Sequence, residues 1–324
     1  MARNHTTSKF QVGVIAAFVF LFLLLPAVSA ARHTVRYENV RQFLPRRSMT
    51  ALAIERILLL AENRTKVITV RKDGSGDFAT VADAVNSIPA GVSRRTVIHI
   101  GPGLYREKVT VDHSKPFVTF YGDRHAMPRI SFDGTAAQFG TFLSATVAVE
   151  SHYFVACNII FENTAPKPAD GQAGAQAVAM RISGDKAAFY NCKFYGYQDT
   201  LCDDRAQARE NISDKSGFSF VSCRISGTGD AFLSRAWKPR SRVVFAYTYM
   251  GSLVDPLGWS DKGLPERQRT VYYGEYKCTG PGSATKNRVS YGKILNDSQA
   301  RPFLSKDFIN GATWLLPPPR LRAF

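Results

Sequence analysis

A short motif that occurs twice restricts the fold of this chain more than any other feature of its sequence. Residues 189–196 and 220–227 each read as an apolar strand, a bend with a Cys, a second short strand and a Gly. Similar apolar runs, punctuated by Gly or Asn, occupy residues 97–101, 118–122, 153–157, 188–192, 218–223 and 243–247. Units of this kind stack as the coils of a solenoid, with like residues over like in interior ladders and an elongated groove on one face.

This pattern predicts an all-β fold, a right-handed parallel β-helix. The alternative is an antiparallel sandwich, whose hairpins commonly turn through dipeptides such as Asn-Gly. Such dipeptides are nearly absent between the apolar runs, and the pair at 310–311 lies near the C-terminus. We expect the solenoid to span residues 67–316 and a Pro-rich tail to follow at 317–324.

A short helix is expected near the start of the solenoid. A strand at 67–70 and a turn at 73–77 precede Thr80, which is a suitable N-cap residue. Pro89 ends the helix, and its apolar residues share one face: Val81, Ala84, Val85 and Ile88. We expect this helix to cover the open first coil and to prevent edge-to-edge association.

The first 30 residues have the three-part layout of a secretory signal peptide. Two basic residues occur without an acidic one, an apolar run follows from Val12 to Leu25, and small residues at 28–30 offer a cleavage point. An uncleaved membrane anchor is the alternative, but the run is short for a bilayer span. We predict cleavage, no membrane association afterwards, and a short leader with one amphipathic helix at 31–66.

The chain is strongly basic, with 42 Lys and Arg against 26 Asp and Glu. A secreted cation of this size suits an acidic polysaccharide. Charge that serves only solubility is an equally good explanation. Nucleic acid is a poor candidate partner, because the chain is expected outside the cell and has no basic helix or zinc-finger spacing.

Secretion gives meaning to three N-glycosylation sequons, which begin at Asn63, Asn211 and Asn296. The five cysteines are an odd number without metal-binding spacing, so at least one thiol is unpaired and no metal site is predicted. Three of them lie in apolar strand-like runs, where we expect buried structural thiols: Cys157, Cys192 and Cys223.

Three short polar motifs at strand ends are the best candidates for chemistry: residues 176–181, 197–201 and 233–237. Motifs of serine hydrolases, phosphate loops, zinc proteases and dinucleotide sites are absent from the sequence. A carboxylate, side-chain amides and a cation at a coil edge suit acyl chemistry on the carboxyl ester of a sugar. Singly, these residues are explained as turn, ladder, ion-pair or core positions, but together and in this order they favour catalysis.

Together with residues 103–107, 141–146 and 274–278, these motifs resemble the plant pectin methylesterase (pectinesterase) family over about residues 67–316. The resemblance implies a right-handed parallel β-helix and a location in the cell wall. It implies hydrolysis of the methyl esters of homogalacturonan to methanol and pectate, with no cofactor and no metal. Pectin is the implied partner, together with a proteinaceous inhibitor, and the chain is expected to be a monomer.

The resemblance also implies roles for individual residues. Asp199 would be the proton donor and later the base, and the amides of Gln176 and Gln198 would stabilise the oxyanion. Arg235 would also orient the nucleophile. Four residues would bind the galacturonan chain, with Trp259 as a weaker candidate platform: Thr141, Gln176, Arg235 and Trp237.

The sequence departs from the family at the nucleophile. Relatives have a second Asp downstream of the Gln-Asp-Thr motif, and no matching Asp-Phe-Ile-Phe-Gly type motif is found here. The join lies near residues 204–206, where about two coils of chain are absent. Nothing in the sequence places Asp203, Asp204 or Asp230 at attack distance. A catalytically inactive pectin-binding protein is therefore the alternative to an active esterase, and a β-helix lyase or glycosidase is a weaker third hypothesis.

Overall fold

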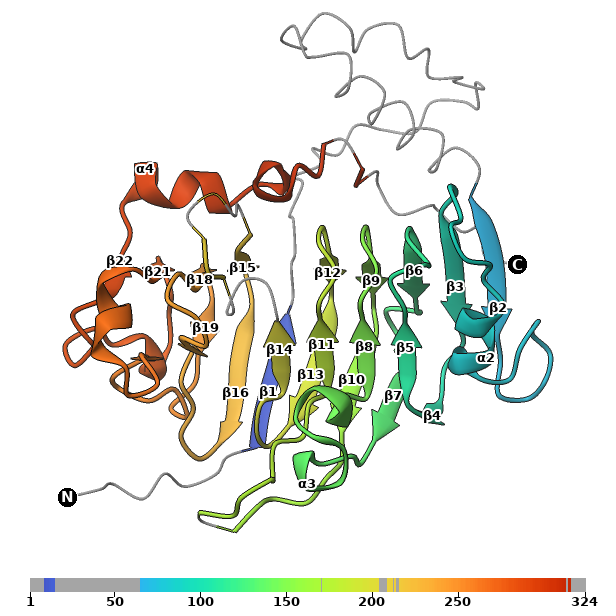
Figure 1. Cartoon of the computed structure of the whole chain (residues 1–324), viewed down its shortest axis with the longest axis horizontal. Helices are drawn as coiled ribbons and strands as arrows, with labels where there is room; N and C mark the ends of the chain where they lie inside the picture. The colour runs from blue at the N-terminus through green and yellow to red at the C-terminus, as the bar shows by residue number, and fades with distance from the viewer. Residues whose placement is uncertain are drawn as a thin grey trace, which may run out of the picture.

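The computed structural model describes residues 9–14 (as backbone), 65–169, 171–203, 209–211, 213, 216–312 and 314–315. Its strands stack into a solenoid whose coils follow one another along the long axis of the molecule (Figure 1). Each complete coil adds three strands in a fixed chain order, one to each of three sheets, which we call sheets I, II and III. All strand pairs are parallel except those of β1 (Lys9–Val14). The predicted parallel β-helix is confirmed, and the sandwich is excluded.

All three sheets are continuous through β14. Sheet I contains β2 (Lys66–Val70), β3 (Thr96–Ile100), β6 (Val118–Tyr121), β9 (Val155–Cys157) and β12 (Ala188–Tyr190). Sheet II contains β4 (Leu104–Arg106), β7 (Arg129–Phe132), β10 (Ile160–Asn163) and β13 (Cys192–Gly196). Sheet III contains β5 (Val109–Val111), β8 (Val147–Val149), β11 (Met180–Ile182) and β14 (Leu201–Asp203).

The same strand order resumes after β14. A separate sheet takes the position of sheet I in these later coils and contains β15 (Phe218–Val221), β18 (Arg242–Ala246), β21 (Tyr272–Tyr276) and β22 (Gly292–Ile294). Strands in the place of sheet II are β16 (Arg224–Thr228) and β19 (Tyr249–Met250). Those in the place of sheet III are β17 (Ser234–Arg235) and β20 (Trp259–Ser260).

The bend between the strands of sheets I and II explains the repeated motif. Asn158 and Asn191 occupy this bend in successive coils with φ of 59° and 48°, a left-handed conformation that Asn tolerates. The side-chain nitrogen of Asn191 donates to Oδ1 of Asn158 at 2.9 Å, which links the two bends. Inside the solenoid, Phe161 stacks on Phe194 with ring centroids 5.4 Å apart. These contacts are the interior ladders that the repeat predicted.

A break divides the solenoid between β14 and β15. Within the described residues, β12 does not pair with β15 and β14 does not pair with β17. Only sheet II continues, because β1 lies antiparallel between β13 and β16. β1 is also the one described part of the predicted signal peptide, whose cleavage stays a prediction. The predicted leader helix and the Pro-rich tail lie outside the described residues.

The C-terminal segment connects the two sides of this break. Its short helices, α4 (Asp297–Ala300), η5 (Arg301–Phe303) and η6 (Lys306–Ile309), run along the outer face of the sheet I strands (Figure 1). Phe303 packs with the β18 and β21 side, and Ser219 Oγ donates to its carbonyl at 2.7 Å. Trp314 packs on the other side of the break, edge-on to Tyr153 at 5.7 Å between centroids.

The predicted capping helix is present at the N-terminal end of the solenoid. α2 (Val81–Asn86) begins at Thr80, whose hydroxyl accepts a hydrogen bond from the Asp83 amide at 3.1 Å. The carboxylate of Glu107 accepts from two further amides at the helix start, those of Val81 and Ala82, at 3.1 and 2.7 Å. Every helix within the described residues is too short to span a membrane.

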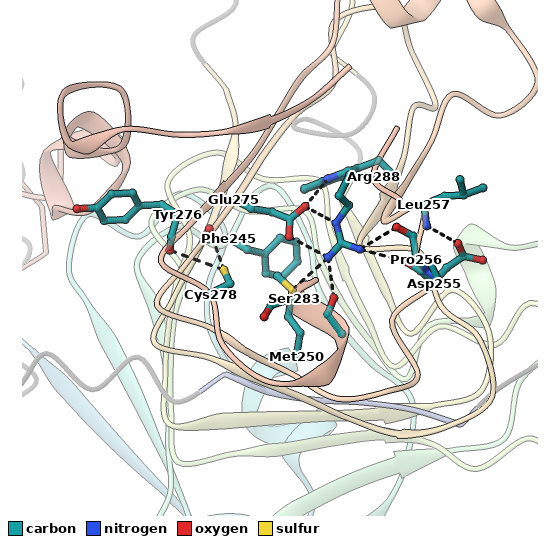
Figure 2. Close-up of polar contacts among 12 residues, drawn as sticks. Phe245, Met250, Asp255, Pro256, Leu257, Glu275, Tyr276, Cys278, Ser283 and Arg288 are labelled. Carbon is teal, nitrogen blue, oxygen red and sulfur yellow. Dashed lines mark hydrogen bonds and ion pairs between the residues drawn. The ribbon is translucent and has the colours of Figure 1, made fainter. Parts of the chain in front are cut away.

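A buried ion pair fastens the last coils. Arg288 and Glu275 are each 4% exposed and form two hydrogen bonds, from Nε to Oε1 at 2.7 Å and from Nη2 to Oε2 at 2.9 Å (Figure 2). The guanidinium also donates to the carbonyls of Pro256 at 3.1 Å and of Gly282 at 2.6 Å, the latter in η4 (Pro281–Ser283). One side chain therefore joins β21 to two loops, and its charge is neutralised locally.

Candidate active site

The candidate site residues lie at one corner of the solenoid, where the chain passes from sheet II to sheet III. Thr141 lies between β7 and β8, Gln176 between β10 and β11, and Asp199 between β13 and β14. Arg235 lies in β17, the sheet III strand of the coil after the break. Because neighbouring strands stack about 4.8 Å apart, successive corners form a row. The sequence motifs thus come from successive coils and line one edge.

Asp199 and Arg235 form an ion pair across the break. The Asp199 carboxylate is 9% exposed, and its backbone is left-handed, with φ of 54°. The Arg235 guanidinium is 37% exposed, and its carbon lies 5.4 Å from the centroid of the half-buried Trp237 ring. Burial lowers the pKa of Arg235. A carboxylate, a cation and an aromatic ring therefore meet in one cluster.

The two amide residues are fixed by their backbones. The Gln198 carbonyl accepts from the Ala177 amide at 3.1 Å, and the Gln176 carbonyl accepts from the Ala136 amide at 2.8 Å. Oε1 of Gln198 is buried and has no hydrogen-bond partner among the described residues. Within that part of the chain, no hydrogen bond or ion pair joins Thr141 or Gln176 to the Asp199–Arg235 pair.

The loop around Thr141 presents apolar side chains that sequence reasoning missed. It contains α3 (Ala136–Phe139) and η2 (Phe142–Ser144), and Phe142 and Leu143 are 55% and 58% exposed. Ser144 holds the loop, since its hydroxyl donates to the Thr141 carbonyl at 2.7 Å and accepts from the Val178 amide at 3.2 Å. The sequence signal that could have indicated this exposed surface is the Phe142-Leu143 pair between the polar residues Thr141 and Ser144.

Trp259 is not a sugar platform, so this prediction was wrong. The side chain is 1% exposed, stacks on Tyr273 at 4.5 Å and donates from Nε1 to Glu275 Oε1 at 3.0 Å. Its position in β20 directs the ring into the core. Trp237 remains the candidate platform. Besides Arg235, its ring contacts Lys262, whose Nζ lies 3.5 Å from the ring centroid.

The other nearby carboxylates occupy different environments. Asp203 is buried at the end of β14, Asp230 is exposed ahead of β17, and Asp204 lies outside the described residues. The five cysteines are free, and the three predicted to be buried thiols are indeed buried. Burial raises the pKa of Cys157 to about 12, as expected for an unreactive thiol.

Comparison with known proteins identifies the family. The family model described as Pectinesterase matches residues 67–205 and 202–312. Pectinesterase 2 of Olea europaea is 42% identical over 304 residues, covering 81% of this chain and 83% of that protein. An Arabidopsis thaliana pectinesterase, number 63, is 47% identical over 292 residues, covering 77% and 86%.

A solved structure agrees with these relatives. Pectin methylesterase from carrot superposes with a TM-score of 0.63 and 30% sequence identity, covering 76% of this chain and 94% of that chain. This chain therefore belongs to the pectinesterase family, a family of carboxylic ester hydrolases.

Proposed function

We propose that this chain acts on methyl-esterified homogalacturonan in the cell wall, releasing methanol and leaving pectate. The cluster of Asp199, Arg235 and Trp237 carries this proposal, because it combines a carboxylate, a cation and a sugar-sized ring at one corner. Family membership supplies the reaction class. The excess of basic residues suits an acidic polymer as partner.

In the proposed reaction, a carboxylate oxygen attacks the ester carbonyl and methanol leaves with a proton from an acid. Water then cleaves the acyl-enzyme and restores the carboxylate. Asp199 serves as the acid and then as the base, while the amides of Gln176 and Gln198 donate to the oxyanion. Arg235 and Trp237, with Thr141 further along the row, hold the polymer. No residue is assigned as nucleophile.

We also propose that between one and two coils present in relatives are absent near residues 204–206. The family model matches in two pieces that meet at residues 202–205. The Arabidopsis alignment runs over 292 residues but takes up 77% of this 324-residue chain, about 250 residues, so about 40 positions have no counterpart here. Strands β3 to β21 at the sheet I positions begin 22–37 residues apart, so about 40 positions is more than one coil but fewer than the two coils expected from the sequence. The sheets break at the same place. This break favours a second candidate function, pectin binding without turnover.

Methanol release from highly methyl-esterified pectin tests the first proposal. We expect release by the secreted chain, its loss in Asp199→Asn, and no change in Asp123→Asn, which removes an exposed carboxylate from the turn between β6 and β7. Absence of release together with salt-sensitive binding to polygalacturonate would support the binding function. A chain that neither releases methanol nor binds either polymer would contradict both proposals.

The remaining parts of the proposal concern the setting of the protein. We propose secretion after signal cleavage, a monomeric chain and a proteinaceous inhibitor as protein partner. We also propose glycosylation at the sequons, of which two begin at exposed residues, Asn211 and Asn296. The Asn296 side chain caps α4 by accepting from the Gln299 amide at 3.0 Å. Peptide mass spectrometry of the secreted chain identifies its N-terminus and its glycans.

A further inference from the structure

Lys262 lies against the aromatic ring of the proposed groove. Its Nζ is 3.5 Å from the centroid of the Trp237 ring, and the guanidinium carbon of Arg235 is 5.4 Å from the same centroid. Lys262 is exposed and Trp237 is half-buried. One ring therefore contacts two cations, and one of these cations faces solvent beside the place where a sugar would stack.

The backbone holds Lys262 in place. Its φ of 65° is left-handed, a conformation that costs a side-chain-bearing residue about 1 kcal/mol. The surrounding turn enforces it: the Lys262 amide donates to Ser260 Oγ at 3.1 Å, and the Gly263 amide donates to Asp261 Oδ1 at 2.9 Å. Ser260 is itself the register partner of Arg235 in the β17–β20 pair. The turn thus delivers the ammonium to the ring.

The charges around this turn are mainly positive. Asp261 is occupied, because its second oxygen accepts from Gln268 Nε2 at 2.6 Å. Asp199 is paired with Arg235, and no ion pair involves Lys262 within the described residues. Burial, and then the neighbouring Arg267 and Arg235, lower the pKa of Lys262. A lysine beside two arginines would gain most from an anionic partner.

We propose that Lys262 is a specificity-determining residue that binds the free carboxylate of a uronate unit whose ring packs near Trp237. A methyl ester at that position carries no charge and leaves the ammonium without an anion. The cation–π contact is worth only about 0.5–1 kcal/mol at an exposed site, so the lysine can turn from the ring to the carboxylate. The groove therefore prefers a de-esterified unit at this position. This inference rests on the proposed galacturonan-binding function.

The test compares binding of two oligomers of equal length, one fully de-esterified and one fully methyl-esterified. The proteins are the wild-type chain, Lys262→Gln and the matched control Lys293→Gln. Lys293 is also exposed and lies 4.6 Å from an aromatic centroid, that of Tyr272, but in β22. Methanol is measured after each titration, and if the chain releases it, the three proteins are compared again with Asp199→Asn added to each, so that the methyl-esterified oligomer stays intact.

We expect Lys262→Gln to weaken binding of the de-esterified oligomer about fivefold at low salt, equivalent to about 1 kcal/mol, and to leave the methyl-esterified oligomer unaffected. Lys293→Gln should change neither affinity. Equal losses for both oligomers, or no loss in Lys262→Gln, would overturn this inference while leaving the proposed function standing. A wild-type chain that binds neither oligomer would overturn both.

Discussion

The buried Arg288–Glu275 pair allows a stability prediction that can be worked from its contacts. Arg288→Met leaves the Glu275 carboxylate with one remaining hydrogen bond, from Trp259 Nε1 at 3.0 Å. It also removes the donors to the Gly282 and Pro256 carbonyls. Breaking a buried pair by removing one partner costs about 3–5 kcal/mol, because an uncompensated charge stays inside. We expect the free energy of unfolding to fall by that amount.

Removing both charges should cost less than removing one. In Glu275→Leu with Arg288→Met no buried ion remains. The unpaired carbonyls are common to this variant and to Arg288→Met, so the double variant exchanges an uncompensated buried carboxylate for one unpaired indole N–H, which costs about 1–3 kcal/mol. The two substitutions are therefore expected to be strongly non-additive. A double variant less stable than Arg288→Met, or equal to the sum of the single variants, would refute this reasoning.

The assay is urea unfolding followed by tryptophan fluorescence, with Arg129→Met as the matched control. Arg129 pairs with Glu162 at 2.9 Å, and its side chain is 40% exposed whereas that of Glu162 is 12% exposed. Water reaches the Arg129 guanidinium and screens this pair, so its loss should cost less than the loss of the pair whose side chains are both 4% exposed. If Arg129→Met and Arg288→Met destabilise the chain equally, burial is not the cause of the effect.

Three further predictions concern titration, thiols and the break. Burial and the neighbouring Arg71 lower the pKa of His99 from its ordinary 6.5, so the unfolded chain binds this proton more readily. The stability contribution of His99 is therefore present above pH 6.5 and is lost as pH falls below it. In His99→Gln, the free energy of unfolding in urea should depend less on pH across this range. An unchanged pH dependence would contradict this role of His99. Native chain treated with iodoacetamide at pH 8 should stay unlabelled at the three buried cysteines and become labelled in denaturant, as peptide mass spectrometry can show. A chain that begins at Ala31, the proposed mature form, lacks β1, so β13 and β16 lose this pairing partner. Ultracentrifugation should still show a monomer, and more self-association than for the full chain would contradict the proposed monomeric state.

The solenoid could be predicted because its signals are local and repeated. The capping helix has its N-cap at Thr80, as the sequence indicated, and the apolar runs lie in the sheet I strands or their continuation. The bend residues also follow from short-range chemistry, since Asn at 158 and 191 accepts a left-handed backbone. Each of these features needs only a few neighbouring residues, which is why single-sequence reasoning reached them.

The contacts within the site depend on stacking between coils, so sequence spacing could not give them. Asp199 and Arg235 meet because the coil that begins with β15 lies against the one that ends with β14. Two tryptophans in similar polar contexts differ in burial: Trp237 follows the end of β17 and is half-buried, whereas Trp259 lies within β20 and packs in the core. The placement of Lys262 over Trp237 likewise depends on the β17–β20 pairing.

The proposed loss of coils has different consequences for fold and for catalysis. The strands before and after the break follow the same order through sheets I, II and III, which is what removal of whole coils would leave. Each coil contacts mainly its neighbours, so a solenoid tolerates the loss of whole coils, whereas loss of a fractional coil would turn interior side chains outward.

Each coil also contributes one corner to the row of site residues, so the same loss removes the middle of that row. Binding groups on both flanks remain, at Gln176 and Arg235, but catalysis needs all its groups within about 1 Å of their places. Binding should therefore survive this shortening more readily than turnover.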